Sequence, residues 1–486
     1  MAKAPMRNDC RISNGCGDVM AFLMSRVAGS CPSGAMSTPG KLALLRRCAG
    51  AVIGALLATA SGTAGAGANG GPAATVAAPV ETPLPGRAPI TLQALVEAAV
   101  SGHPLARGAM RELDAAKVDV EAAQRRWWPS ASLVMESHST SVNSPASRGA
   151  QLEQTLWDGG QINANIDRAR ADVSKSEARV TWQRQQLALQ VIGAWQSLIS
   201  ARDRIAISQA TMTRLRDYEA QMRRRVAADA SPAVDIELAL SRLRQTEVDL
   251  TTARSALRLA AQRIEQLSGV AGLDAEADTL AAWPDAQQVK DVSARLLAED
   301  VGAQAWDSAA VKMAQGDVAV MRAQLDAKSA QRWPTAYLRV NRPLGDAYPG
   351  ARTDRGVSVF VGLRYTPGAG FSTGVEADAL RERVSAASMA VDAAWLEQRE
   401  AMLGDIDQIA AAENQLAALE SAVTGSQHVL DSYSRQFTAG RKTWIDLLNA
   451  VRELAQNQYA RADSQAALAA AAYRLQVRLG ATELAP

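Results

Sequence analysis

The residue types that usually carry catalysis or bind metal ions are few and widely separated in this sequence. Its three histidines, His103, His138 and His428, are far apart, and each is expected to be a surface or packing residue. We find no zinc-ligand spacing, no P-loop and no arrangement of serine, histidine and aspartate that would support catalysis. We therefore expect no catalytic residues, no metal site and no cofactor, and predict that the chain is not an enzyme.

The four cysteines all lie near the start of the chain, at Cys10, Cys16, Cys31 and Cys48. A basic segment at 41–47, an apolar run at 49–60 and small residues after it form the pattern of a secretory signal peptide. A transmembrane anchor is the alternative, but the run is shorter than the roughly 20 residues that a spanning helix needs. We expect a signal-peptide region over 1–68, with Met36 as a candidate start, and a disordered leader over 69–89. Once the signal-peptide region is removed, no thiol remains, which suits an oxidising compartment.

Charge and composition exclude some classes of protein. The chain has 52 basic and 50 acidic residues, so no bulk electrostatic reason favours a nucleic-acid partner. The basic trio Arg223, Arg224 and Arg225 is expected to be a solvated helix face, with a docking patch for partner helices as the alternative. Only 4% of the residues are aromatic, whereas alanine is abundant. This composition favours long helices packed closely through small side chains.

The elements that would position any functional residue come in two copies, spaced by roughly 210 residues. Residues 105–128 and 310–333 each read as a helix that ends at a Trp-Pro pair. In both halves a strand, a polar loop, a second strand, a glycine turn and long helices follow. We expect a first repeat over 90–268 with strands at about 130–157, an equatorial segment over 269–305, a second repeat over 306–480 with strands at about 334–366, and a tail over 481–486.

The helices after the glycine turns are unusually long. Residues 161–228 contain no proline and would span roughly 100 Å at 1.5 Å per residue, and residues 372–437 are similar. In the last helix, small and apolar residues recur at the coiled-coil spacing of three and four, as in Trp444, Leu448, Val451, Ala455 and Tyr459. A cytoskeletal rod is the alternative, but a rod has no use for four interposed strands and an export signal.

The strands alternate as membrane strands do. Between residues 357 and 365, one face carries Val357, Val359, Val361, Leu363 and Tyr365, and the other carries Ser358, Phe360, Gly362 and Arg364. Aromatic residues at the strand ends, where an interfacial belt would lie, are Trp127, Trp128, Trp157, Trp333 and Tyr365. Ordinary hairpin packing against helices is the alternative for any one strand.

Closure of the sheet favours a membrane pore. In a bilayer every backbone polar group must be paired, so an open sheet cannot span it. Four strands are too few to close a barrel around a lumen, whereas three protomers would supply about twelve. We therefore predict an oligomer, with the trimer as the simplest number that suffices.

Several segments together carry a family resemblance: ITLQALVEAAVSGHP, the WWPS and RWP helix ends, the LWDGG turn and AGRKTWIDLLNA. Through them, residues 90–482 resemble the TolC-like outer-membrane efflux family. The resemblance implies a mostly α fold with a small membrane part: a trimeric, 12-strand β-barrel continuous with a periplasmic α-helical barrel. It also places the protein in the outer membrane of a Gram-negative cell, in contact with outer-membrane lipid and extending into the periplasm.

The resemblance further implies a periplasmic constriction and a gate latch. Asp446 matches an acidic pore-lining position, where three carboxylates around one axis would attract cations. Asn449 stands where a second acidic ring is expected, so the constriction would carry half the charge. Lys442 matches a basic residue that links to the Asp235 region, and Phe437 replaces a tyrosine whose hydroxyl serves the latch. The latch is therefore expected to depend on the Lys442–Asp235 pair, with solvated turn charges as the alternative.

The resulting functional hypothesis is a passive exit duct. Because the chain has no ATP site, its energy would come from an inner-membrane partner reached through a periplasmic adaptor. We favour type I secretion with an ABC exporter of a protein such as an RTX toxin, since many drug-efflux members carry a lipidated N-terminal cysteine and this chain does not. The alternative is small-molecule or metal efflux with a proton-driven pump. A periplasmic adaptor is a third class, but adaptors carry a single helical hairpin.

Overall fold

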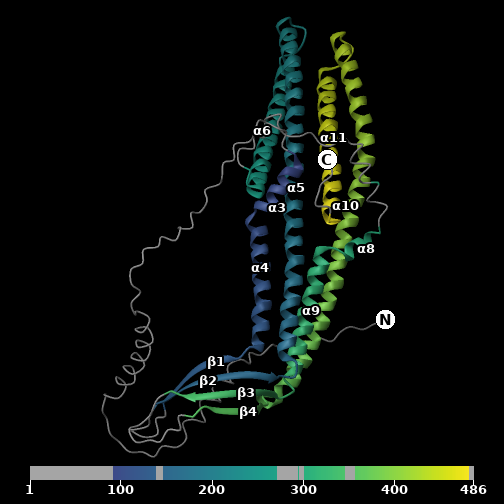
Figure 1. The fold of residues 1–486 in the computed structure, drawn as a ribbon. Helices are drawn as coiled ribbons and strands as arrows, with labels where there is room; N and C mark the ends of the chain where they lie inside the picture. Colours follow the sequence, from purple (N-terminus) through teal and green to yellow (C-terminus); the bar gives the residue numbers. More distant parts are fainter. Residues whose placement is uncertain (1–90, 138–145, 271–293, 295–299, 345–355, 481–486) are drawn as a thin grey trace, which may run out of the picture. The chain divides into compact units, whose positions relative to one another are not determined.

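The computed structural model describes residues 91–137, 146–270, 294, 300–344 and 356–480 (Figure 1). All of them belong to one compact unit, Leu84–Pro486. The predicted signal-peptide region, the leader, most of the equatorial segment and the tail lie outside the described residues.

The element order repeats along the chain. The first part contains α3 (Leu92–Gly102), α4 (Pro104–Gln124), a 3-10 turn (Arg125–Trp127), β1 (Ser130–Ser137), β2 (Ala146–Trp157), α5 (Gln161–Ala227) and α6 (Val234–Ser268). The second contains α8 (Val301–Trp306), α9 (Ala309–Ala330), β3 (Thr335–Pro343), β4 (Ser358–Arg364), a 3-10 turn (Ala369–Phe371), α10 (Ser372–Thr438) and α11 (Trp444–Arg478). Helices α5 and α10 have 67 residues each, and α6 and α11 have 35 each. The order α4-β1-β2-α5-α6 thus recurs as α9-β3-β4-α10-α11.

The LWDGG turn shows how the sequence directs a strand into a long helix. The buried carboxylate of Asp158 accepts hydrogen bonds from the backbone N–H groups of Gly160 (3.0 Å) and Ile162 (2.5 Å), at the start of α5. Gly159 has a φ of +68°, and a Cβ there would lie 2.9 Å from the carbonyl oxygen of Ala330. Only glycine avoids both the unfavourable φ and this clash with the end of α9.

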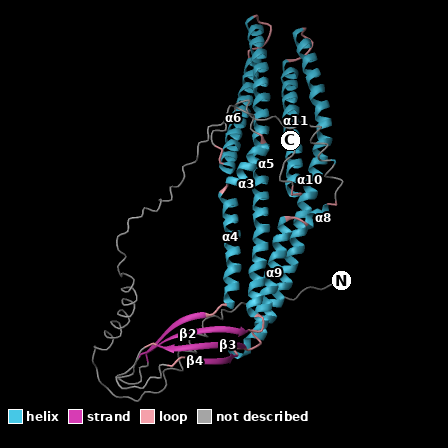
Figure 2. Cartoon of the chain, in the orientation of Figure 1, coloured by secondary structure: helices cyan, strands magenta, loops and turns pink. Residues whose placement is uncertain are grey.

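The four strands form one antiparallel sheet in the order β1-β2-β3-β4 (Figure 2). The central pair, β2 and β3, joins the two halves of the chain, and β1 and β4 are the edges. In the register, Glu153 lies opposite Arg339, and Arg339 lies opposite Phe360.

The helices pack around α5, which contacts α3, α4, α6, α9 and α11, whereas α10 packs against α8, α9 and α11. The largest core cluster joins α5 to α3, α6 and α11 through buried side chains such as Trp195, Leu198, Ile264 and Ala470. Alanines 469–472 in α11 are all buried, so the neighbouring helices approach it closely. The mostly helical fold is therefore confirmed. None of the helices in the described part of the chain is long and apolar enough to cross a membrane.

Candidate functional site

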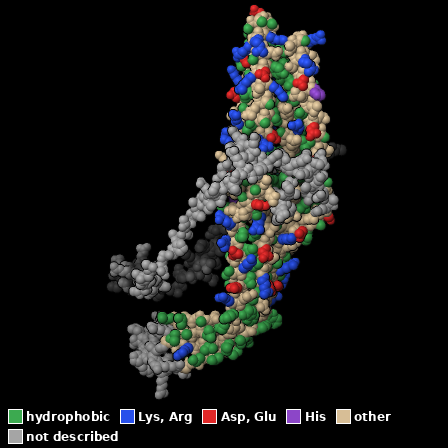
Figure 3. Space-filling model, turned by 45° about the horizontal axis from the view of Figure 1, so that its top comes forward, with side chains coloured by type: hydrophobic (Ala, Val, Ile, Leu, Met, Phe, Trp, Pro, Cys, Tyr) green, Lys and Arg blue, Asp and Glu red, His purple; other side chains and the backbone are tan. Residues whose placement is uncertain are grey.

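The sheet has two chemically different faces. Residues directly opposite in an antiparallel register point to the same side, so the pairing assigns each side chain to a face. The largely apolar face carries Leu133, Ala150, Leu152, Leu338, Val340, Val359, Val361 and Leu363. Val361 and Leu363 are 76% and 74% exposed. Figure 3 shows apolar side chains gathered over the strands, whereas charged side chains are scattered over the helices. An exposed apolar surface of this kind indicates a membrane or protein partner.

The opposite face is mostly polar, with Val134 and Phe360 as its large apolar members. It carries Ser130, Ser132, Gln151, Glu153, Thr155, Thr335, Tyr337, Arg339, Asn341, Ser358 and Arg364. This separation of polar from apolar faces agrees with the alternation predicted for residues 357–365. It is the pattern of a strand with lipid on one side and water on the other.

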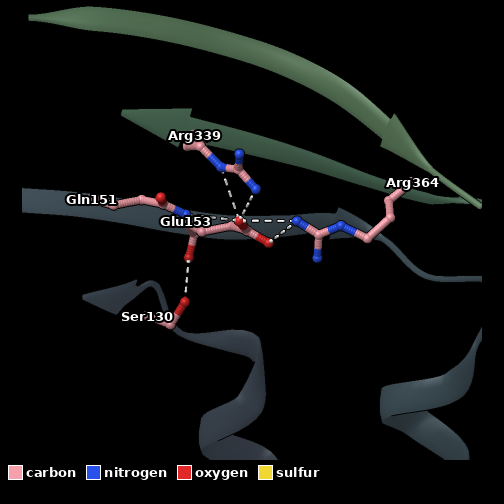
Figure 4. A network of polar contacts seen from close by, with 5 residues as sticks. All are labelled: Ser130, Gln151, Glu153, Arg339 and Arg364. Atoms are coloured by element: carbon pink, nitrogen blue, oxygen red, sulfur yellow. Dashed lines mark hydrogen bonds and ion pairs between the residues drawn. The ribbon is translucent and has the colours of Figure 1, made fainter. Parts of the chain in front are cut away.

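Glu153 is the centre of a charged network on the polar face (Figure 4). Arg339 donates to its Oε2 through Nη2 (2.7 Å) and Nε (3.1 Å). Arg364 donates to the same oxygen through Nη2 at 3.3 Å and lies 3.2 Å from Oε1. The Gln151 amide also donates to Oε2 (3.3 Å), and the Ser130 hydroxyl donates to the Glu153 carbonyl oxygen (3.2 Å). One carboxylate from β2 therefore holds two guanidinium groups from β3 and β4.

Tyr337 completes this network. The guanidinium carbons of Arg339 and Arg364 lie 4.9 and 4.7 Å from the centre of its ring, within the range of a cation–π contact. Opposite Tyr337 in the register is Gly362, where a Cβ would lie 2.7 Å from the tyrosine Cζ. Glycine at this position therefore leaves room for the ring to lie over β4, between the two arginines.

Aromatic side chains lie at the end of the sheet nearest the helices, as predicted. Trp157 and Trp333 make an edge-to-face contact with ring centroids 6.4 Å apart. The indole N–H of Trp127 donates to the Asn163 amide oxygen at 3.3 Å, and Trp128 is exposed. A hydrogen-bonded indole next to an exposed one suits a boundary between lipid and water.

The second group of candidate residues lies at the turn between α10 and α11. The Thr443 hydroxyl donates to Asp446 Oδ2 at 2.7 Å, and the Asp446 backbone N–H donates to the same hydroxyl at 3.2 Å. This capping box begins α11. The hydrogen bond from the Thr443 side chain, together with the Thr443 N–H and the Lys442 charge, holds the pKa of Asp446 below its usual value. The carboxylate therefore stays ionised in mildly acidic solution.

Lys442 lies beside Asp446. Its ammonium nitrogen is 3.8 Å from Asp446 Oδ2 and 4.3 Å from the centre of the Tyr433 ring. The pairing of Lys442 with Asp235 stays a prediction. Asn449 is half-buried on α11, one helical turn beyond Asp446.

The sequence reasoning missed the contacts that join the two hairpin tips. The indole N–H of Trp444 donates to the backbone oxygen of Asp235 at 3.0 Å. Arg225 donates through Nη2 to the carbonyl oxygens of Phe437 (3.1 Å) and Thr438 (3.3 Å). Its guanidinium lies 4.3 Å from the centre of the Phe437 ring. The hairpins α5/α6 and α10/α11 are thus tied together by side chains from both.

These contacts change the interpretation of two sequence features. The arginines of the basic trio do not form one uniform face: Arg223 pairs with Glu219 on its own helix, whereas Arg225 donates a hydrogen bond to α10. Phe437 is buried and packs against Trp444, with ring centroids 5.3 Å apart. The hydrogen bond from Trp444 could have been anticipated from the sequence, because a buried indole N–H needs a hydrogen-bond acceptor.

Halfway along the hairpins, a polar cluster joins α5 to α11. Asp463 accepts hydrogen bonds from Arg204 Nη2 (2.5 Å), Arg204 Nε (3.1 Å) and the Ser200 hydroxyl (2.6 Å). Burial raises the pKa of Asp463, but the hydrogen bonds from Arg204 and Ser200 outweigh it and leave that pKa below its usual value. The hydroxyls of Ser208 and Tyr459 lie 2.8 Å apart nearby. The two hairpins are therefore held in register by charge as well as by apolar packing.

Known outer-membrane efflux proteins are similar to this chain in sequence. Residues 95–270 match the family described as outer membrane efflux protein. The outer membrane efflux protein BepC of Brucella suis biovar 1 (strain 1330) is 24% identical over 331 residues, which cover 67% of this chain and 70% of BepC.

Solved channel structures share the fold. The outer membrane protein VceC of Vibrio cholerae has a TM-score of 0.67 at 15% identity, over 80% of this chain and 96% of VceC. The open state of the Neisseria gonorrhoeae MtrE outer membrane channel has a TM-score of 0.65 at 15% identity, over 80% of this chain and 88% of MtrE.

Proposed function

From the match of residues 95–270 to the outer membrane efflux protein family and the fold shared with outer-membrane channels, we propose that this chain is a TolC-like channel protein of the outer membrane that extends into the periplasm and works as the exit duct of a tripartite export system. The observation that carries this proposal is that the two repeats contact each other through only one of two equivalent sets of elements within the single chain. Its first half meets its second half mainly through three pairs of elements: β2 pairs with β3, and α5 packs against both α9 and α11.

The repeat implies three matching contacts in the other direction. They would pair β4 with β1, and would pack α10 against α4 and α6. Within the described chain, β1 and β4 are sheet edges, and α10 does not pack along α4 or α6. A second copy presenting its first half to the second half of this chain would make all three contacts, and a ring of copies would leave none open.

Exposed apolar side chains support this arrangement. On α10, Val375 and Met389 are 72% and 63% exposed, and on α4 Val118 is 64% exposed. On α6, Val248 and Leu259 are 59% and 69% exposed. Covering such side chains contributes about 25 cal/mol per Å² of apolar area. The unmatched helices therefore carry the surface that association between copies would bury.

We propose a homotrimer with a 12-strand β-barrel in the outer membrane and an α-helical barrel in the periplasm. Three copies supply about twelve strands, enough for a water-filled lumen. The apolar sheet face would contact lipid, and the polar face that bears Glu153 would line the lumen. The separation of the two faces supports this orientation.

At the periplasmic end, we propose that Asp446 and Asn449 form the pore constriction. Asp235, Lys442 and Phe437 would form the latch that holds the hairpins together. The Trp444–Asp235 hydrogen bond supports a latch role for the Asp235 region, and the Arg225 contacts support one for Phe437. Asp446→Asn is expected to lower cation selectivity in single-channel recordings, and Lys442→Ala to raise conductance. Unchanged currents in both variants would remove these assignments and leave the duct itself standing.

The partners would be a periplasmic adaptor and an inner-membrane pump. For the pump and cargo, we propose an ABC exporter and a secreted protein such as an RTX toxin, as in type I secretion. The second candidate is small-molecule or metal efflux with a proton-driven pump, which the name of the relative BepC, an efflux protein, favours. Deleting the gene distinguishes the two: loss of a secreted protein supports the first, and accumulation of toxic small molecules inside the cell supports the second.

The duct itself is tested with purified full-length protein in detergent. We expect a trimer by mass and a conducting pore after insertion into a planar lipid bilayer. A stable, water-soluble monomer that carries no ion current would contradict the proposal.

A further inference from the structure

A cluster of charged side chains on the polar face of the sheet carries a net positive charge. In it, two positive charges, Arg339 and Arg364, surround one negative charge, Glu153. The cluster has an excess of one positive charge per chain, or three per trimer. The inference below rests on the proposed function, because it takes this face to line the lumen.

The two arginines do not share the carboxylate equally. Arg339 makes two hydrogen bonds to Glu153 Oε2, the shorter at 2.7 Å, and its side chain is 27% exposed. Arg364 makes longer contacts of 3.2 and 3.3 Å, and its side chain is 47% exposed. Glu153 itself is only 19% exposed. Arg339 and Glu153 therefore neutralise each other most closely, and Arg364 supplies the positive charge that remains for the solvent.

The surrounding residues hold this charge in place. Tyr337 contacts both guanidinium groups through its ring, and Gly362 leaves the space in which that ring lies. Three neighbouring strands contribute to the group, so the sheet register fixes its position. Arg364 is therefore a positioned charge and not a mobile surface side chain.

We propose that Glu153, Arg339 and Arg364 form a basic collar that makes the duct favour anions at the level of this cluster. A ring of three such groups around the lumen would raise the local concentration of small anions and of anionic groups on cargo. The proposed carboxylate ring at Asp446 has the opposite sign. The duct would then contain two charge filters in series, cation-favouring at the periplasmic end and anion-favouring where the sheet meets the helices.

The test measures reversal potentials of the full-length channel in a planar bilayer under a potassium chloride gradient. All variants carry Asp446→Asn, so that the periplasmic ring does not mask the collar. Arg364→Gln removes the excess charge and is expected to lower the chloride-to-potassium permeability ratio by about twofold at ~10 mM salt. Glu153→Gln adds a positive charge and is expected to shift the ratio in the opposite direction.

The matched control is Arg342→Gln. Arg342 lies on the same strand as Arg339 but on the apolar face of the sheet, opposite Ala150. Its substitution removes the same charge and is expected to leave the permeability ratio unchanged. Salt gives a second control, because screening lengths of about 30 Å at 0.01 M fall to about 3 Å at 1 M, so the shifts should disappear at high salt.

The outcomes separate this inference from the duct proposal. Conducting trimers in which Arg364→Gln leaves the ratio unchanged would overturn the collar and retain the duct. Equal shifts from Arg364→Gln and Arg342→Gln would also overturn the collar, because its charge would then act without regard to the face. A wild-type protein that carries no current would overturn the duct proposal. If Glu153→Gln fails to assemble, Arg364→Gln alone decides.

Discussion

Helices α6 and α11 have the same length and the same place in their repeats, yet their surroundings differ. Near its C-terminal end α11 is buried on almost every side, because it packs against both α10 and α5. Helix α6 packs mainly against α5 and leaves Val248 and Leu259 exposed. Equivalent helices thus differ because one finds its second neighbour within the chain, whereas the other would find it in another copy in the proposed ring.

The cores of the two hairpins differ as well. In α10 and α11, the buried Asp405 accepts hydrogen bonds from Arg474 (2.8 Å) and Arg478 (2.9 Å). Counted from the start of each helix, the same places in α5 and α6 hold Ala194, Ile264 and Ser268, all buried. One fold position is therefore filled by an ionic cluster in one repeat and by small or apolar side chains in the other.

The largest expected effect comes from breaking that ionic cluster. Asp405→Ala leaves two largely buried arginines without their carboxylate and should destabilise the fold by about 3–5 kcal/mol. Denaturant unfolding of the detergent-solubilised protein, followed by circular dichroism, would measure the loss. The triple variant Asp405→Ala, Arg474→Ile, Arg478→Ser copies the first repeat, and most of the stability should return. Equal losses in the single and triple variants would show that the two cores are not interchangeable.

The next effect concerns the two faces of the sheet. Val361→Arg puts a charge on the apolar face and should cost about 2–4 kcal/mol per chain if that face meets the middle of the bilayer. Ser358→Arg puts the same charge on the polar face of the same strand and should be tolerated. Trimer yield in outer-membrane fractions would measure both. Similar yields of the two variants would contradict the assignment of the faces.

A smaller effect is expected at the hairpin tips, where Trp444 and Val234 occupy the first positions of α11 and α6. Trp444→Phe keeps an aromatic ring but removes the hydrogen bond to Asp235, at a cost of about 1 kcal/mol. Because this contact ties the tips together, single-channel conductance should rise. Val234 is 67% exposed, so Val234→Ala should change neither stability nor conductance. A Trp444→Phe channel with wild-type conductance would separate this bond from gating.

The smallest effect concerns the helix caps. Thr443 caps α11, whereas Ala233 at the same place before α6 provides no side-chain cap. Because the pKa of Asp446 is lowered in the folded protein, its contribution to stability is present above its unfolded pKa and is lost as pH falls through the lower folded value. Thr443→Ala copies the first repeat and removes the main cause of the lowered pKa.

The prediction for Thr443→Ala is a shift in pH dependence. In the variant, cation selectivity should be lost at a pH near the ordinary aspartate pKa of about 3.9. In the wild type it should be lost at a lower pH. Selectivity measured from pH 6 down to about 3 would show the shift. Identical pH profiles would mean that Asp446 does not set the selectivity.

Much of the architecture was predictable from the sequence because its signals are local. The proline-free segments predicted α5 and α10 almost to their ends, and the alternation after Val357 predicted the two faces of β4. The Glu153 network was not predictable, because it needs the register of three strands, which no local pattern encodes. The same holds for Arg225 and Trp444, whose partners lie about two hundred residues away and are brought near only by helix packing.

The two free edges of the sheet, β1 and β4, have a consequence for how the protein is made. An unpaired strand edge is a template for wrong pairing, and in lipid its backbone groups would have no partners. If the sheet spans the bilayer as proposed, a lone copy would leave these edges unpaired, and the strands would close only when subunits meet. Assembly should then depend on concentration, and slow synthesis should leave a larger share of the chains unassembled.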